Sequence, residues 1–153
     1  MPKTSAGLLM YRRAPGGTIE ILLVHPGGPF WAKKDLGAWT IPKGEYLDDE
    51  EPLAAARREF EEETGFVAAG PFAELGAIKL SSGKRVTAWA FEGDGDPARV
   101  VSNTFELEWP KGSGRMKQFP EVDRAAWFSP EEARRRILPA QVPLLEAFLA
   151  LHR

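Results

Sequence analysis

The sequence predicts a single domain of mixed α/β (α+β) class, built from a mixed β-sheet and several helices. Short apolar runs of strand length alternate with segments whose apolar residues recur at helical spacing. The chain has 153 residues, which suits one domain, and it contains no internal repeat or linker. We therefore expect residues 1–153 to form one domain.

The N-terminal half is predicted to contain two strands and a helix. Residues 5–12 form a short apolar run, and residues 19–25 are almost continuously apolar, which is typical of a strand buried on both faces. A helix is expected over residues 51–64, because Pro52 suits a first helical turn and Gly65 suits the position just past the last turn.

The C-terminal half is predicted to hold the remaining strands and two helices. The expected strands, each bounded by turn-forming segments, are 75–80, 85–91, 104–109 and 123–128. Ser129, Pro130 and Glu132 form a helix start of the capping-box type. Residues 141–151 carry leucine and phenylalanine at helical spacing, so we expect the second helix there.

The composition excludes several functional classes. The net charge of −2 gives no reason to expect nucleic acid or an anionic membrane as a partner. Without cysteine there can be no disulfide, no thiolate nucleophile and no cysteine-bound zinc or iron–sulfur cluster. No apolar run approaches the roughly 18 residues of a membrane-spanning helix. We therefore expect a cytoplasmic protein.

Charge is distributed unevenly along the chain. Residues 44–66 contain nine acidic and two basic residues, a local charge of −7 that leaves +5 on the remainder. On the predicted helix, Glu59, Glu62 and Glu63 follow the i, i+3, i+4 spacing that brings side chains onto one face. Their mutual repulsion would be offset by a divalent cation, and carboxylates without histidine or cysteine favour magnesium or manganese. A solvated acidic helix face is the alternative interpretation.

The same segment carries a pattern of fixed positions. Gly44 is followed after five residues by Glu50 and, after seven more, by Arg58-Glu59, Phe60, Glu61, Glu62-Glu63, Thr64, Gly65 and Phe66. This pattern resembles the complete Nudix box of the Nudix hydrolases at every fixed position. The resemblance implies the Nudix fold, in which a mixed β-sheet is sandwiched between helices and the box forms a loop–helix–loop. It also implies hydrolysis of a nucleoside diphosphate linked to another group, with Mg²⁺ or Mn²⁺ as cofactor.

The resemblance further implies roles for individual residues. The expected metal ligands are Gly44, through its carbonyl, and Glu59, Glu62 and Glu63. Arg58 resembles the arginine that orients a glutamate of the box, with Glu50 as its expected partner. The expected catalytic residues are therefore Glu59, Glu62, Arg58 and Glu50.

The identity of the general base differs within this family. A box glutamate, Glu59 or Glu62, can take that role. So can a downstream acid, and the candidates are Glu106, Glu108 and Glu121. The sequence leaves these alternatives open.

The entrance to the box bears on the substrate. Residues 39–44 resemble the entrance in dinucleoside polyphosphate and diphosphoinositol polyphosphate hydrolases, where Lys43 would add a cation beside a long phosphate chain. The chain departs from the dinucleotide-hydrolase pattern at residues 47–49, where a Pro-Gly turn is common. Residues that could extend phosphate binding are Lys33, Lys34, Lys84, Arg85, Lys111, Arg115 and Lys117, and residues that could stack on a base are Phe30, Trp31, Trp89 and Trp109.

Other functions are compatible with the same box. A Nudix-fold sensor module binds a nucleotide without cleaving it, although such modules usually have eroded box glutamates. A hydrolase for ADP-ribose, nucleotide sugars or oxidised nucleoside triphosphates is a further alternative. In each case the expected partner is a nucleotide-type small molecule, not nucleic acid or a membrane, and the expected state is a monomer or homodimer.

Overall fold

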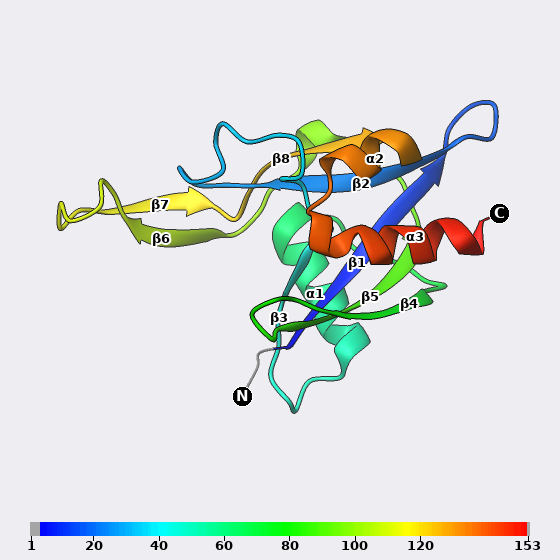
Figure 1. Cartoon of the computed structure of the whole chain (residues 1–153), viewed down its shortest axis with the longest axis horizontal. Helices are drawn as coiled ribbons and strands as arrows, with labels where there is room; N and C mark the ends of the chain where they lie inside the picture. The colour runs from blue at the N-terminus through cyan, green and yellow to red at the C-terminus, as the bar shows by residue number, and fades with distance from the viewer. Residues whose placement is uncertain (1–3, 153) are drawn as a thin grey trace.

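The computed structural model describes residues 4–152 and confirms the mixed α+β fold (Figure 1). The helices and strands in chain order are β1 (Thr4–Arg13), β2 (Ile19–Pro26), β3 (Lys43–Glu45), α1 (Pro52–Thr64), β4 (Ala73–Lys79), β5 (Arg85–Glu92), β6 (Thr104–Glu108), β7 (Met116–Pro120), β8 (Val122–Phe128), α2 (Pro130–Arg136) and α3 (Val142–Leu151). Short 3₁₀ turns lie at Pro97–Arg99 and Pro139–Gln141. Within residues 4–152, no helix has the length and apolar character needed to cross a membrane.

The main sheet is organised around β1. Its strand order is β4-β5-β1-β2-β8, with β3 also paired to β1. Strand β1 runs parallel to β5 and antiparallel to β2 and β3, so the sheet is mixed as predicted. The start of β1 pairs with β3 and its end pairs with β2, which brings the entrance of the box onto the central strand.

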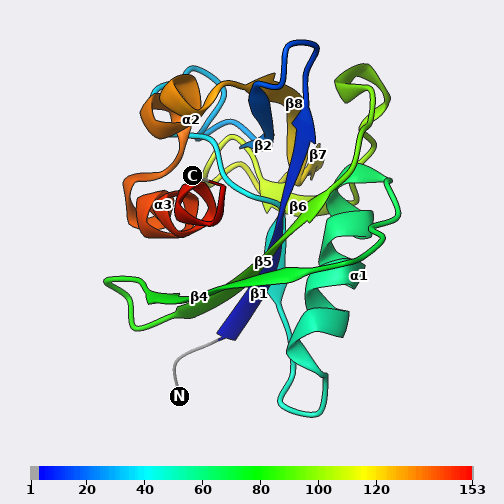
Figure 2. The ribbon, with the colours of Figure 1, turned by 90° about the vertical axis from the view of Figure 1, so that its right-hand side faces the viewer.

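Helices cover both faces of this sheet (Figure 2). Helix α1 packs on one face through Ala55, Ala56 and Phe60, all fully buried. Helices α2 and α3 cover the other face, where Leu145 and Phe148 join the second core cluster. Strand β2 lies between the two clusters and is buried on both faces, which confirms the expectation from its continuous apolar run.

Close contact between β1 and β3 depends on Gly7. A Cβ at Gly7 would lie 2.8 Å from both the Lys43 Cβ and the Pro42 carbonyl oxygen. Real Cβ atoms do not approach neighbours so closely, so a side chain here would push β3 off the sheet. Gly7 thereby fixes the position of Lys43 and Gly44 relative to the central strand.

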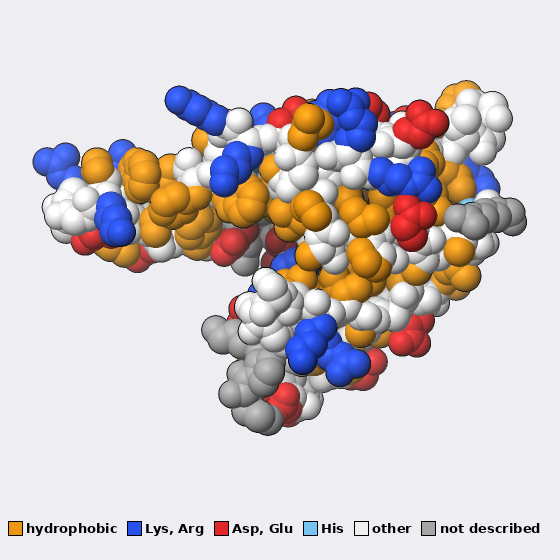
Figure 3. Space-filling view, viewed as in Figure 1, with side chains coloured by type: hydrophobic (Ala, Val, Ile, Leu, Met, Phe, Trp, Pro, Cys, Tyr) orange, Lys and Arg blue, Asp and Glu red, His pale blue; other side chains and the backbone are white. Residues whose placement is uncertain are grey.

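Strands β6 and β7 form a separate two-stranded hairpin that projects from the body of the molecule (Figure 1). Hydrophobic side chains gather along one of its faces (Figure 3). The sequence predicts β6, as residues 104–109, but it predicts no strand at residues 116–120 or 43–45. Both missed strands are short. Strand β3 is Lys-Gly-Glu, and the apolar residues of β7 do not alternate with polar ones, so neither has the pattern from which a strand is recognised.

Candidate active site

Helix α1 ends at the predicted residue and begins within one residue of the predicted start. Glu51 is its N-cap, and the Glu51 carboxylate accepts hydrogen bonds from the backbone N–H groups of Leu53 (3.2 Å) and Ala54 (2.9 Å). The helix proper starts at Pro52, one residue later than predicted. Gly65 ends it with φ of 81°, a conformation that glycine adopts without strain.

Arg58 connects the acidic residues of the box. Its guanidinium donates two hydrogen bonds to the Glu50 carboxylate, both at 2.9 Å, so the expected Arg58–Glu50 pair is present. It also donates to Glu59 at 2.9 Å and to Glu62 at 3.2 Å. The hydrogen bonds from Arg58 lower the pKa of Glu50 and keep that carboxyl group ionised. Arg58 therefore orients two of the three predicted metal-binding glutamates.

Gly44 and Glu59 are in direct contact across the site. A Cβ at position 44 would overlap the Glu59 carboxylate, so only glycine leaves that carboxylate where it lies. The Glu59 side chain is only 14% exposed, and burial, followed by repulsion from Glu62, raises its pKa. A cation between the Glu59 and Glu62 carboxylates would offset both the burial of the Glu59 charge and the repulsion between the two groups.

This contact leads to a prediction for Gly44→Ala. The new methyl group should displace the Glu59 carboxylate, because a flexible side chain yields more readily than the backbone of β3. We expect kcat to fall at least about tenfold, since misplacement by about 1 Å can cost that much. Thermal unfolding should change by only a few degrees. A variant with wild-type kcat would contradict the placement of Glu59 in the catalytic machinery.

Glu63 links the end of α1 to β3. Its Oε2 atom accepts a hydrogen bond of 2.9 Å from the backbone N–H of Lys43. Burial is the main influence on this carboxyl group and raises its pKa to about 8. Burial, together with the neighbouring Lys84 ammonium, lowers the pKa of Lys43. The protein thus places two titratable groups in surroundings that disfavour their charged forms, as active sites often do.

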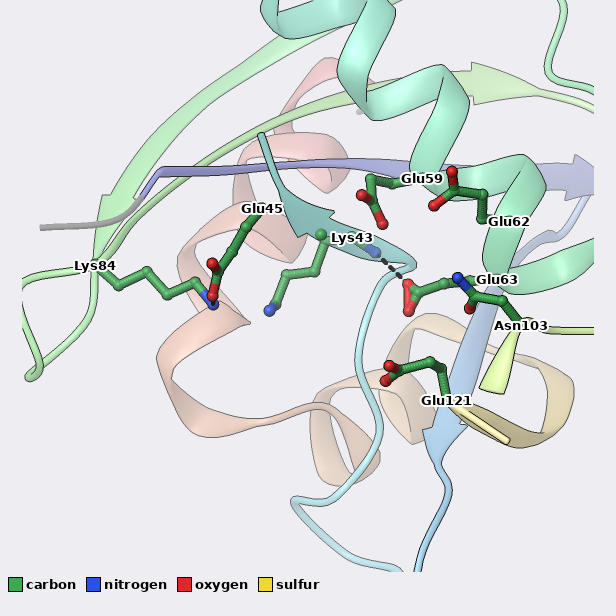
Figure 4. A pocket seen from close by; sticks show the side chains of 9 residues that line it. Lys43, Glu45, Glu59, Glu62, Glu63, Lys84, Asn103 and Glu121 are labelled. Atoms are coloured by element: carbon green, nitrogen blue, oxygen red, sulfur yellow. Dashed lines mark hydrogen bonds and ion pairs between the residues drawn. The ribbon is translucent and has the colours of Figure 1, made fainter. Parts of the chain in front are cut away.

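A cavity of about 380 Å³ opens in front of these groups (Figure 4). Its lining residues are Lys43, Gly44, Glu45, Glu59, Glu62, Glu63, Lys84, Asn103 and Glu121. The side chains of Glu59, Glu62, Glu63 and Glu121 lie on one side of the cavity, and those of Lys43 and Lys84 extend along the other. The cavity therefore combines oxygen ligands for a cation with two ammonium groups.

Asn103 and Glu121 reach this cavity through the end of α1. The Asn103 N–H donates to the Glu62 carbonyl oxygen, and the Glu121 N–H donates to the Asn103 carbonyl oxygen, both at 2.9 Å. The first bond satisfies a carbonyl group in the last turn of α1 that would otherwise lack a partner, and the second attaches Glu121 to Asn103. Asn103 was not predicted from the sequence, because its neighbourhood forms no recognisable motif.

The structure separates the remaining sequence candidates. Of the three downstream acids, Glu121 lines the cavity, whereas Glu106 and Glu108 lie on exposed positions of the projecting hairpin. Glu108 instead accepts a hydrogen bond from the Gly112 N–H at 2.7 Å. Lys84 also lines the cavity, where it pairs with Glu45 at 3.2 Å. The other basic candidates do not line it.

The donor set suits a hard divalent cation. The cavity offers five carboxylates, one of which (Glu45) is paired with Lys84, and the Gly44 backbone, and its lining residues include no histidine. Among residues 4–152, no three acidic or histidine side chains are already arranged around one metal position. Arg58 instead holds Glu59 and Glu62. All four predicted ligands, Gly44, Glu59, Glu62 and Glu63, line the cavity, and they are the residues that would hold a cation there.

Comparison with known proteins agrees with this geometry. A family model described as the NUDIX domain matches residues 1–148. A search of curated protein sequences found no match. The chain resembles a solved Ap4A hydrolase of C. elegans, with 25% identity, 98% of this chain and 97% of that chain covered, and a TM-score of 0.65. It also resembles the E. coli ORF135 protein, with 26% identity, 99% and 92% coverage, and a TM-score of 0.57.

A third solved structure shares the fold alone. The NUDIX domain of Shewanella oneidensis NrtR, solved with ADP ribose, is 15% identical, with 100% of this chain and 90% of that chain covered and a TM-score of 0.66. The family match extends over nearly the whole chain, and the glutamates of the box meet in one cavity. This chain therefore belongs to the NUDIX domain family and is a Nudix pyrophosphohydrolase.

Proposed function

We propose that this enzyme hydrolyses a pyrophosphate bond in nucleotides with a long phosphate chain, such as dinucleoside polyphosphates, and that it depends on Mg²⁺ or Mn²⁺. The observation that carries this proposal is the cavity with carboxylates on one side and Lys43 and Lys84 on the other. The similarity to an Ap4A hydrolase at 25% identity supports the same substrate class.

Electrostatics favour a polyanion at this position. Lys43 and Lys84 repel each other, and this repulsion contributes to the lowered pKa of Lys43. A phosphate group between the two ammonium groups would relieve their repulsion. A phosphate chain that also meets a cation held by the glutamates must span both sides of the cavity. A longer chain makes both contacts at once, whereas a short diphosphate makes fewer.

Different residues of the site orient the carboxylates, accept the proton of the attacking water and bind the phosphate chain. A divalent cation, when bound, neutralises phosphate charge and lowers the pKa of a water molecule. Arg58 orients Glu59 and Glu62 through its hydrogen bonds. We place the general base among the cavity carboxylates, Glu59, Glu62 or Glu121, because Glu106 and Glu108 lie outside the cavity. Lys43 and Lys84 bind and orient the phosphate chain.

Substitution of Lys43 tests the chain-length argument. We expect Lys43→Ala to lower kcat/KM for a dinucleoside tetraphosphate roughly tenfold to a hundredfold, the effect of losing one charge-assisted contact. The loss should be smaller for ADP-ribose or a nucleotide sugar. The measurement is steady-state hydrolysis of this panel with Mg²⁺, with Mn²⁺ and with a chelator. The wild type should prefer the tetraphosphate and lose activity with the chelator.

Lys79→Ala provides a matched control. Lys79 lies at the exposed end of β4, so its substitution removes the same charge from outside the cavity. It should leave the substrate preference unchanged. Equal losses on long and short substrates for Lys43→Ala, or a wild-type preference for ADP-ribose, would overturn the chain-length proposal. Undiminished hydrolysis in metal-free buffer would overturn the metal dependence.

A further inference from the structure

The projecting arm, residues 104–120, has two faces of different chemical character. Its register pairs Phe105 with Phe119 and Leu107 with Lys117. Paired residues of antiparallel strands lie on the same face, so these four side chains form one face that is apolar with a basic group. The two acidic residues of β6 alternate to the opposite face. The arm therefore keeps its acidic groups apart from its apolar and basic face.

Positive charge gathers toward the far end of the arm. Residues 109–117 contain Lys111, Arg115 and Lys117 but no acidic residue, which gives a local charge of +3 in a chain whose net charge is −2. All three side chains are exposed, and none forms an ion pair within the described part of the chain. The end of the arm thus carries positive charge that the rest of the described chain does not neutralise.

An exposed aromatic side chain lies beside these basic groups. Phe30 packs edge to face against Trp109, with ring centroids 5.6 Å apart, and Phe30 is still 62% exposed. A two-stranded hairpin that stands apart from a larger sheet is only marginally stable in water. A partner that covers the apolar and basic face would therefore stabilise the arm.

A surface of the opposite charge lies in the loop of residues 46–51, which connects β3 to α1. Leu47 in this loop is 73% exposed, and the exposed residues Asp48 and Asp49 follow it. Neither aspartate forms an ion pair with another residue of the range 4–152. The loop thus presents an apolar side chain beside two negative charges, which complements the end of the arm.

The arm and this loop border the same open notch of the molecule (Figures 1 and 3). In Figure 1 the arm extends to the left, and the loop turns at the bottom, before the start of α1. The two surfaces lie apart within one chain. A two-fold rotation that places the arm of one copy on the loop of a second copy also places the second arm on the first loop. The same two surfaces can therefore close into a symmetric pair.

We propose that this chain forms a homodimer in which the arm of each copy docks on the 46–51 loop of the other. Lys111 and Arg115 of one copy face Asp48 and Asp49 of its partner copy, and Leu47 packs against the exposed aromatic side chains of the arm. A stable interface buries about 1,200–2,000 Å² in total, and symmetry divides that area between two equal contacts. The inference does not depend on which substrate the enzyme cleaves.

A second copy fits these surfaces better than other polyanions do. An anionic lipid surface or a nucleic acid would match the positive charge of the arm. Neither would account for an exposed leucine beside two aspartates at the other side of the same notch. A second copy covers both surfaces at once and pairs their opposite charges.

Charge reversal of each surface tests the proposal. One variant of the full chain carries Lys111→Glu with Arg115→Glu, and a second carries Asp48→Lys with Asp49→Lys. In sedimentation equilibrium the wild type should be a dimer. Each variant alone should weaken the dimer at least about tenfold, because like charges then meet at both contacts. Thermal unfolding of each variant verifies that the monomer is folded.

An equimolar mixture of the two variants makes the test decisive. In a mixed dimer, the reversed arm of one chain meets the reversed loop of the other, and the two unchanged surfaces also meet. Both contacts then join opposite charges, so the mixture should form dimers when neither variant does so alone. Arg13→Glu with Arg135→Glu is the matched control. Arg13 ends β1 and Arg135 lies on α2, both away from the notch, so this variant should dimerise as the wild type does.

Three results would overturn the proposal. The first is a wild type that stays monomeric at about 100 μM, which would limit any self-association to a very weak one. The second is a dimer that both reversals leave intact, since its interface would then lie elsewhere. The third is a mixture that stays monomeric although each reversal disrupts the dimer. A monomeric wild type that sediments with phosphatidylserine vesicles, and loses this binding on reversal of the arm, would assign the arm to a lipid surface instead.

Discussion

Replacement of Glu62 by Gln should lower kcat at least about 10²-fold, the effect of removing a group that stabilises developing charge in the transition state. Glu62 lies on the cavity side of α1, where its carboxylate is held by Arg58 at 3.2 Å. Gln has nearly the same shape but no negative charge, so it binds a divalent cation poorly. The measurement is kcat for the best substrate of the panel at saturating Mg²⁺.

Glu61→Gln is the matched control for this change. Glu61 is the preceding residue of the same helix, but it is exposed and does not line the catalytic cavity. The same chemical change at position 61 should leave kcat within about twofold, as for most surface substitutions. A loss of only some ten percent in Glu62→Gln would instead make Glu62 a surface residue and refute its proposed role.

The second large effect is on stability, and it concerns Glu63. Folding raises the pKa of this carboxyl group to about 8, from an ordinary value of 4.5, mainly through burial. The folded state therefore holds a proton that the unfolded state releases above pH 4.5. The metal-free protein should lose stability as the pH rises from about 4.5 to 8, by an amount on the order of a few kcal/mol.

Glu63→Gln should remove this pH dependence. The Gln side chain is neutral and still offers an oxygen that can accept the hydrogen bond from the Lys43 N–H. We expect the variant to match the wild type near pH 4.5 and to exceed its stability near pH 8. Urea unfolding with a chelator present, at several pH values, measures the difference.

Two observations would contradict this account of Glu63. A large destabilisation by Glu63→Gln at every pH would show that the carboxylate is a structural partner of β3. Equal pH dependence in the wild type and the variant would place the sensitive group elsewhere. Mg²⁺ should also raise the melting temperature of the wild type more than that of the variant, because the variant lacks one proposed ligand.

Much of the fold was predictable because local patterns determine it. Strand β2 is continuously apolar, and Ser129 caps α2 by accepting from the Glu132 N–H as its capping-box pattern indicates. Strands β3 and β7 were not predictable in this way. Neither has an alternating apolar pattern, and they become strands through pairing with β1 and β6.

The residues of the candidate site show the same contrast between local pattern and tertiary contact. Glu59, Glu62 and Glu63 were predictable as a group because helical spacing brings them to one face, and the resemblance to the Nudix box implied their role. Asn103 and Glu121 come from distant segments, and their positions depend on tertiary contacts. A single sequence carries no local signal for such contacts, so Asn103 was missed and Glu121 could not be distinguished from Glu106 and Glu108.

The two residues that flank the projecting hairpin both line the cavity of about 380 Å³. Asn103 precedes β6 and Glu121 follows β7, and the Glu121 N–H bonds to the Asn103 carbonyl oxygen at 2.9 Å. This hydrogen bond holds the first and last residues of the hairpin segment together, and it does not depend on the residues between them. Evolution can lengthen, shorten or redecorate the tip near residues 111–114 by adding or removing strand pairs, without moving either cavity residue. The ends of this segment thus contribute residues to the cavity, while its tip can differ in length and surface between related proteins.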